Sequence, residues 1–168
     1  MPFEIQSHVA ALDLNTGLFF NALRDLDDDH ARRRVAPGVN SAAFIAAHLV
    51  DARHYLLKQL GVAHPNPMDA FGQVRGEDEL RALPPLADLR AAWLDVTPVL
   101  RAALLALTPE QAAQPEQTFP IALTGALGAV VFLLHHESYH LGQLGLLRKH
   151  LGQPAMAYTP APEVAAAP

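Results

Sequence analysis

The sequence contains no cysteine among its 168 residues. This absence excludes disulfide bonds, cysteine-ligated zinc or iron–sulfur centres and cysteine nucleophiles. Charged residues are also scarce, at 17% against 51% hydrophobic residues, which disfavours intrinsic disorder and favours a folded globular protein. The net charge of −5 argues against a protein that binds the phosphate backbone of nucleic acids. Because cysteine is missing, the nine histidines are the first candidates for chemistry.

Signals for export or membrane insertion are lacking as well. The N-terminus, MPFEIQSHVA, has neither the basic nor the apolar region of a secretory signal, so we expect a cytoplasmic protein. The uncharged run over residues 117–136 has the length of a spanning helix, which is about 20 residues. It contains Pro120, Thr124 and Gly125 and lacks a flanking Lys/Arg cluster, so we interpret it as a buried helix after an irregular connection, without a membrane role.

Alternating strand patterns and internal repeats are absent. Apolar residues at three- and four-residue spacing predict helices over about 4–26, 41–60, 86–107 and 124–150, and Asn40 or Ser41 can cap the second. Pro98 should kink or break the third helix. Thr108, Pro109 and Gln111 indicate the start of a short further helix. The chain is therefore predicted to be an all-α four-helix bundle with a long loop, residues 61–80, between the second and third long helices.

The end of the chain differs in composition from the rest. Gly152 and Pro154 should end the last helix, and the Ala/Pro-rich residues that follow should be extended or disordered. We therefore predict one helical domain over residues 1–152 and a C-terminal tail over residues 153–168. The last helix is apolar nearly all round and must be covered on several sides, which makes a homodimer a reasonable hypothesis.

Two histidines in the last predicted helix have the spacing of metal ligands. His136 and His140 lie four residues apart, so a helix places both on one face, within an apolar stripe. Two imidazoles at this distance can share one metal ion. The alternative is a pair of core histidines that bond to the backbone or to each other.

The segment HESYH also matches the HExxH pattern of zinc peptidases, in which the glutamate, here Glu137, is the general base. The longer peptidase signature does not follow, because the Gly and His that it requires after His140 are missing. The only later acidic residue is Glu163, in the predicted tail, which is a poor place for a rigid third ligand. A zinc peptidase is therefore the less favoured alternative.

His48 lies on the apolar face of the helix predicted over residues 41–60. A third histidine from a neighbouring helix would complete three nitrogen ligands and leave coordination positions open for water or substrate. A lone structural histidine is the plainer interpretation of this residue. Gln143 could hydrogen-bond a ligand histidine or bound water, or another helix. Tyr55 is interpreted as a core aromatic rather than a pocket residue.

A helix with a central histidine, followed about 90 residues later by H-x-x-x-H-x-G-Q, resembles the DinB-like superfamily. The resemblance covers nearly the whole chain except the tail, and the matching residues are His48, His136, His140, Gly142 and Gln143. It implies a bundle, often dimeric, that holds a divalent metal such as zinc or nickel on the three histidines. Members are described as metal-dependent hydrolases, and some as thiol S-transferases or isomerases that use a low-molecular-weight thiol. Many relatives have Arg where this chain has Leu141.

These patterns together predict a divalent-metal protein that acts on a small molecule, with a low-molecular-weight thiol as one candidate partner. A hydrolase and a thiol transferase are the enzyme classes that the resemblance favours. A helical module that uses the metal only for stability, and binds a partner through its surface, remains the alternative. No general acid or base follows from the sequence, since Glu137 is suggested only by the HExxH pattern.

Overall fold

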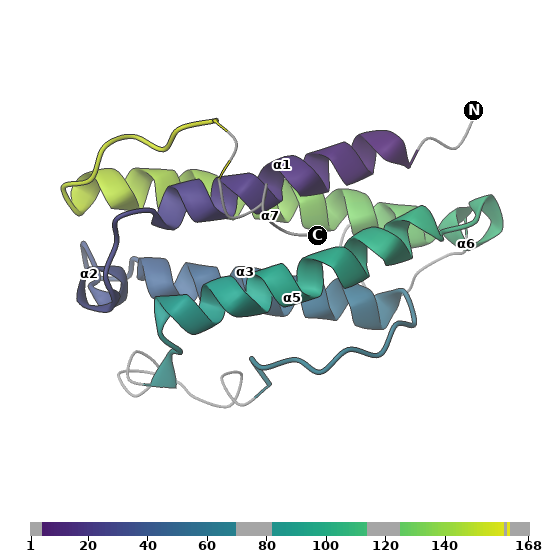
Figure 1. Ribbon diagram of the computed structural model, residues 1–168, viewed down its shortest axis with the longest axis horizontal. Coiled ribbons are helices and arrows are strands. Elements are labelled where there is room, and N and C mark those ends of the chain that lie inside the picture. Colours follow the sequence, from purple (N-terminus) through teal and green to yellow (C-terminus); the bar gives the residue numbers. More distant parts are fainter. Residues whose placement is uncertain (1–4, 70–81, 114–124, 160, 162–168) are drawn as a thin grey trace.

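The computed structural model describes residues 5–69, 82–113, 125–159 and 161. These residues form four long helices, α1 (Gln6–Leu23), α3 (Ala42–Gln59), α5 (Leu86–Leu105) and α7 (Gly125–His150). Two short helices, α2 (Asp28–Arg32) and α6 (Pro109–Ala113), lie at opposite ends of the long ones (Figure 1). The predicted all-α class is confirmed. The described part of the long loop, residues 61–69, contains no helix, and residues 70–81 lie outside the described residues.

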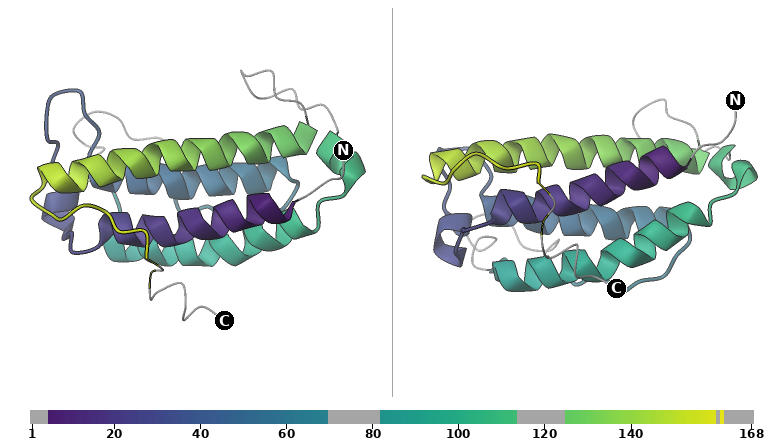
Figure 2. Two further views of the ribbon diagram at one scale, coloured as in Figure 1. Left: turned by 90° about the horizontal axis from the view of Figure 1, so that it is seen from above. Right: turned by 45° about the horizontal axis from the view of Figure 1, so that its top comes forward.

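The four long helices pack side by side and form a closed ring of neighbours. α1 packs against α7 and α5, and α3 packs against the same two helices. Figure 2 shows this arrangement from two further directions. Among the described residues, each long helix therefore packs against two other long helices, and the apolar stripes predicted from the sequence meet in the middle. The neighbouring pair α3 and α7 carries the histidines singled out above.

The helix starts follow the capping chemistry expected from the sequence. Ser41 is the N-cap of α3, and its Oγ accepts a hydrogen bond from the Phe44 N–H at 3.1 Å. Before α6, the Thr108 N–H donates to Gln111 Oε1 and the Gln111 N–H donates to Thr108 Oγ1. This reciprocal pair is a capping box. These two starts are confirmed because a cap depends only on neighbouring residues.

Pro98 does not break α5, which runs without interruption from Leu86 to Leu105. We expected a kink or a break, because proline removes one backbone N–H from the helical ladder. The helix continues because buried side chains hold it on both sides of the proline, namely Trp93 and Val96 before it and Leu100 and Leu104 after it. The expected break at Pro98 was therefore wrong, because packing on both sides of the proline holds the helix together.

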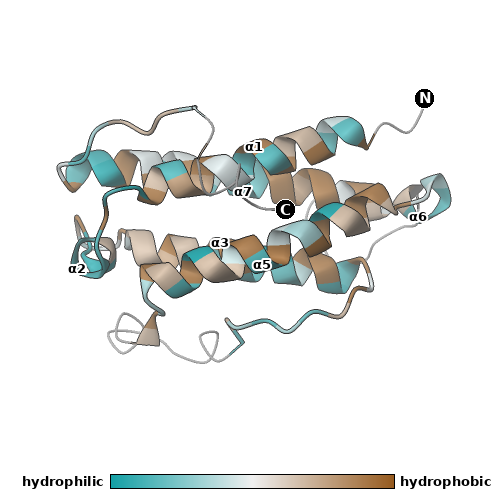
Figure 3. Cartoon of the chain, viewed as in Figure 1, coloured by the Kyte–Doolittle hydropathy of each residue, from teal (hydrophilic) through white to brown (hydrophobic). Residues whose placement is uncertain are grey.

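The apolar core fills the space between the long helices. Leu12 and Phe19 of α1 are fully buried, as are Leu89 and Trp93 of α5. The Phe19 and Trp93 rings stack at a centroid distance of 4.3 Å. Figure 3 shows hydrophobic residues distributed over the four long helices and hydrophilic residues on α2. Burial of these aromatic and aliphatic side chains is the main force that stabilises such a bundle.

A buried ion pair lies within this core. Arg53 of α3 donates from Nε to Glu137 Oε1 of α7 at 2.7 Å, and both side chains are 0% exposed. Arg53 also donates to Thr16 Oγ1 of α1 and Thr97 Oγ1 of α5, and Asn15 of α1 donates to Glu137 Oε2. The network thus connects all four long helices. The network could not be predicted from the sequence, because the residues next to Arg53 and Glu137 do not indicate that these two charges are buried.

The described part of the C-terminal segment lies against the bundle. Residues 153–159 are irregular, and Figure 2 shows them running back along α7 and α1. The Asn21 side chain of α1 donates to the carbonyls of Ala157 and Thr159, and Arg148 donates from Nε to the Pro154 carbonyl. These contacts give the segment defined neighbours on two helices.

None of the described helices is long and apolar enough to cross a membrane. Within the uncharged run noted above, residues 117–124 lie outside the described residues, and the remainder forms the first part of α7. Buried residues of α7 such as Val130, Leu133 and Leu134 belong to the core of the bundle.

Candidate metal centre

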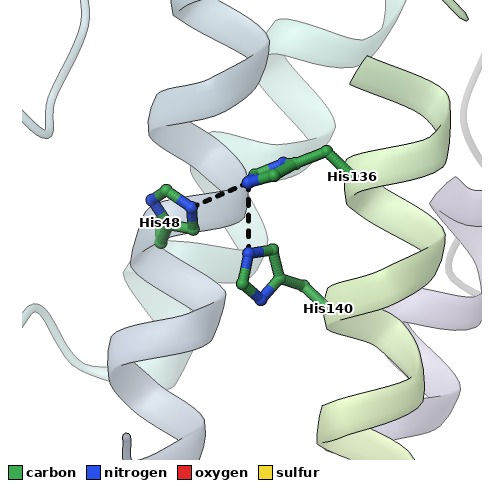
Figure 4. Close-up of side chains that lie close together, drawn as sticks. All are labelled: His48, His136 and His140. Atoms are coloured by element: carbon green, nitrogen blue, oxygen red, sulfur yellow. Dashed lines mark hydrogen bonds between the residues drawn. The ribbon is translucent and has the colours of Figure 1, made fainter. Parts of the chain in front are cut away.

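Three histidines from two neighbouring helices meet at one point. His48 comes from α3, and His136 and His140 come from successive turns of α7 (Figure 4). The His136 Nε2 atom lies 3.0 Å from His48 Nε2 and 3.1 Å from His140 Nε2. The ligand nitrogens of all three residues lie within 4.8 Å of one another, and together they could hold a metal ion. The structure therefore brings together all three residues that sequence analysis singled out.

The donor chemistry of this group fits a divalent cation. A neutral imidazole carries one N–H and one lone pair, so three Nε2 atoms that face one another cannot satisfy each other fully by hydrogen bonds. A cation among them would accept all three lone pairs at once. Zinc and nickel both accept imidazole nitrogens readily, so the donor set suits the metals expected from the family resemblance.

Gln143 orients one of the three rings. Its Oε1 lies 2.7 Å from His140 Nδ1, and since an amide oxygen only accepts, Nδ1 carries the proton and donates. The His140 Nε2 atom then keeps a free lone pair that faces the other two rings. A hydrogen bond to a candidate ligand histidine is one of the interpretations given above for Gln143. His136 has no such partner, because its Nδ1 is buried without a hydrogen bond among the described residues.

The electrostatics keep His136 and His48 neutral. Burial, and after it the neighbouring His140, His48 and His135, lower the pKa of His136 to about 4. The pKa of His48 is also lowered, first by burial and then by His140, against the opposing effect of Asp51. A neutral imidazole is the form that binds metal. His136 and His48 are therefore ready to act as ligands at neutral pH.

Aromatic rings support the histidines from the side. The Phe44 ring stacks on His48 at a centroid distance of 6.3 Å, and Phe132 stacks on His136 at 5.9 Å. Apolar neighbours limit the access of water to the nitrogens and lower the local dielectric constant, which strengthens any charge interaction there. The rings therefore add to the burial that lowers the pKa of His48 and His136.

Two cavities adjoin this part of the molecule. The smaller, of about 170 Å³, is lined by His48 and His136 together with apolar residues of α3 and α7. The larger, of about 600 Å³, lies over the C-terminal half of α3 and the segment 62–69. Asp51 and Tyr55 line both cavities. Tyr55 is 40% exposed and faces solvent. Its interpretation as a core aromatic was therefore wrong.

Glu137 lies on a different face of α7 from His136 and His140. Its carboxylate is fully buried and accepts hydrogen bonds from Arg53 and Asn15. One residue along a helix is a rotation of about 100°, so the neighbour of a ligand histidine points away from the ligand face. A carboxylate held in this way cannot take a proton from a water at the histidines. The structure therefore argues against the zinc-peptidase alternative, which needs Glu137 as its base.

His54 and His64 form a separate pair. Their rings stack at 5.2 Å with an interplanar angle of 8°, and His64 Nε2 donates to Asp95 at 2.8 Å. His54 is 5% exposed, and neither ring nitrogen has a hydrogen-bond partner among the described residues. Burial and the nearby His64 lower its pKa. His54 lies outside the three-histidine group.

A helical bundle with a three-histidine centre between two of its helices defines the class of the protein. Its family follows from sequence: a model of the DinB superfamily matches residues 11–144, so the chain belongs to that superfamily. The expected resemblance is confirmed. Relatives of this family often have Arg at the position of Leu141, but Leu141 is buried in the core and lines neither cavity.

A solved structure shares the fold. The crystal structure of a conserved protein from Enterococcus faecalis superposes with a TM-score of 0.74 at 14% sequence identity. The match covers 90% of this chain and 98% of the other. At this identity the likeness concerns the fold alone. No curated protein matches the chain in sequence.

Proposed function

We propose that the protein binds one divalent metal ion, zinc or nickel, through His48, His136 and His140 and acts there on a small molecule. The observation that supports this most is the convergence of three Nε2 atoms from two helices beside a cavity. A divalent ion held there would supply Lewis acidity, which favours the deprotonated form of a water or a thiol.

The chain's own residues would set the coordination. Three neutral imidazoles bring no negative charge, so the site would keep a net positive charge suited to an anionic nucleophile. Among the described residues, no carboxylate and no further histidine joins the group. Three protein ligands leave at least one position free, as catalytic sites do, whereas structural zinc sites fill all four. Gln143 would keep His140 in the ligating tautomer.

Family membership adds the reaction classes. We propose hydrolysis of a small substrate, or transfer to or from a low-molecular-weight thiol, as the activities to test first. The cavity that reaches His48 and His136 favours an enzyme over a metal-stabilised interaction module, because a purely structural site needs no access. The cytoplasmic location stays a prediction.

The first experiment is a measurement of metal content by plasma mass spectrometry on protein without an expression tag. We expect close to one ion per chain in the parent and little in His48→Ala and His140→Ala. His135→Ala is the matched control, because His135 is exposed on the same helix and outside the group. Full metal occupancy in either ligand variant would refute the ligand assignment.

A second experiment separates a catalytic from a structural site. Cobalt-substituted protein should change its visible spectrum on addition of azide or a thiol, because an open coordination position exchanges its ligand. A spectrum that responds to neither would indicate a closed site and support the interaction module instead.

A further inference from the structure

The smaller cavity beside the histidines has an almost wholly apolar lining. Its volume is about 170 Å³, and it lies between α3 and α7. The apolar lining consists of Ala52, Leu56, Ala129, Phe132 and Leu133. His48 and His136 form the side of the cavity nearest the proposed metal, and Asp51 and Tyr55 complete the lining. A polar or charged group placed there would lose its hydration without finding partners among these aliphatic and aromatic side chains.

The size of the cavity limits what can enter it. A dry, apolar cavity of about 150 Å³ lined by aliphatic and aromatic side chains accepts benzene. The present cavity, at about 170 Å³, has room for one six-membered ring or a branched alkyl group of similar volume. Its volume and lining therefore both favour a single apolar group.

The larger cavity has a more polar lining than the smaller one and adjoins it. Asp51 and Tyr55 line both, and Lys58, His64, Asn66 and Asp69 are among the other residues of the larger one. The Asp51 carboxylate is held in place, because its Oδ1 accepts a hydrogen bond from Asn66 Nδ2 at 2.7 Å. With both signs of charge and an amide on its walls, this cavity offers hydrogen bonds that the smaller one lacks.

We propose that the substrate is an amphiphilic small molecule with one apolar group, the size of a single ring, which enters the smaller cavity. Its polar remainder lies in the larger cavity beyond Asp51 and Tyr55, and its reacting group lies beside His48 and His136. This inference rests on the proposed function, since the histidine centre is where the reaction would occur. Among the described residues, Asp51 is the one acidic group that lines the smaller cavity, so an anionic group is disfavoured there by repulsion as well as by desolvation.

The cavity can be tested without metal. Benzene is titrated into metal-free protein while the methyl signals of Ala52 and Ala129 are followed by NMR. Both signals should shift with saturation in the parent.

Two variants fill the cavity. Ala52→Leu, at a half-buried position, should abolish the benzene-induced shift of the Ala129 methyl signal. Ala129→Val should abolish the benzene-induced shift of the Ala52 methyl signal. Ala91→Leu, on the exposed face of α5, is the control and should respond like the parent. Unshifted methyl signals in the folded parent at saturating benzene would overturn the inference.

The link to the histidine centre is tested with two thiols on cobalt-substituted protein. Phenylmethanethiol should bind at least about tenfold more tightly than 2-mercaptoethanol, because only its ring buries apolar surface in the cavity. Ala52→Leu should remove this preference while cobalt content and the affinity for 2-mercaptoethanol stay at parent values. Equal affinities in the parent, or a preference that survives the cavity-filling variants, would overturn the inference.

These experiments distinguish a failure of the proposed function from a failure of the proposed substrate class. Protein that binds no cobalt, or whose cobalt spectrum responds to neither azide nor a thiol, refutes the proposed function. The benzene titration still decides whether the cavity accepts an apolar group, because it needs no metal. Normal cobalt and thiol binding without ring preference refutes the substrate class alone.

Discussion

Arg53 and Glu137 form a fully buried ion pair, with Arg53 Nε 2.7 Å from Glu137 Oε1 and Nη2 3.2 Å from Oε2. The two residues lie on the helices that carry the histidines, and Glu137 directly follows His136. The Arg53 guanidinium also lies 3.3 Å over the Trp93 ring of α5. The pair therefore fixes the register of α3 against α7, and with it the meeting of His48 with His136.

Removal of one partner of this pair should destabilise the protein strongly. We expect Glu137→Gln and Arg53→Met each to lower the free energy of unfolding by about 3–5 kcal/mol, because the remaining charge stays buried without its counterion. Urea unfolding followed by circular dichroism measures this loss. Arg101→Ala, which breaks an exposed pair with Asp13, is the control and should cost less than about 1 kcal/mol. Equal small losses at both pairs would contradict the structural role.

Loss of the Gln143 side chain should weaken metal binding. Gln143→Leu removes the acceptor that holds His140 Nδ1–H, and such partners typically contribute about 10–100-fold to metal affinity. Gln143→Glu keeps an oxygen acceptor and should retain most of the affinity. Competition with a coloured chelator measures both variants. An unchanged affinity in Gln143→Leu would show that the hydrogen bond does not orient a ligand.

The stability of the metal-free protein should fall on mild acidification, in part through His54. Burial holds the pKa of His54 below its ordinary value of 6.5, so the unfolded chain binds its proton more readily than the folded one. The stabilising contribution is complete above pH 6.5 and is lost as the pH falls from there through the folded pKa. His54→Phe should therefore flatten the dependence of the unfolding free energy on pH below this value, by at most about 1.4 kcal/mol per pH unit.

Urea unfolding of the parent and of His54→Phe between pH 7.5 and 5, with chelator present, checks this expectation. The other buried histidines are common to both proteins, so their contributions cancel in the comparison. Parallel curves for the two proteins would show that His54 titrates alike in the folded and unfolded chains.

The predicted homodimer can be tested on the exposed side of α7. Tyr139 is 60% exposed and Leu146 is 58% exposed, and with Val131 they leave apolar surface on this helix. If a second copy covers it, Leu146→Asp should convert a dimer to a monomer in sedimentation velocity. Leu105→Asp, at an exposed apolar position on α5, should leave the dimer intact. A parent that sediments as a monomer at tens of micromolar would remove this hypothesis.

Local features of the chain could be predicted from the sequence because they depend on neighbouring residues. The periods of three and four residues predicted the four long helices, and Ser41 and Thr108 predicted the starts of α3 and of the short helix α6. The spacing of His136 and His140 placed both on one face, since a helix turns every 3.6 residues. The family pattern added His48 to this pair.

Only the tertiary structure decided which distant residues meet. No local pattern reveals that Arg53 lies against Glu137, that Asn21 holds the segment after α7, or that α5 passes Pro98 unbroken. Each depends on packing between helices, where burial decides the outcome and outweighs local preference. The same holds for the cavity beside His48 and His136, because its walls come from two helices whose register is set by long-range contacts. The sequence by itself determined the helices and the ligand spacing, and packing determined what surrounds them.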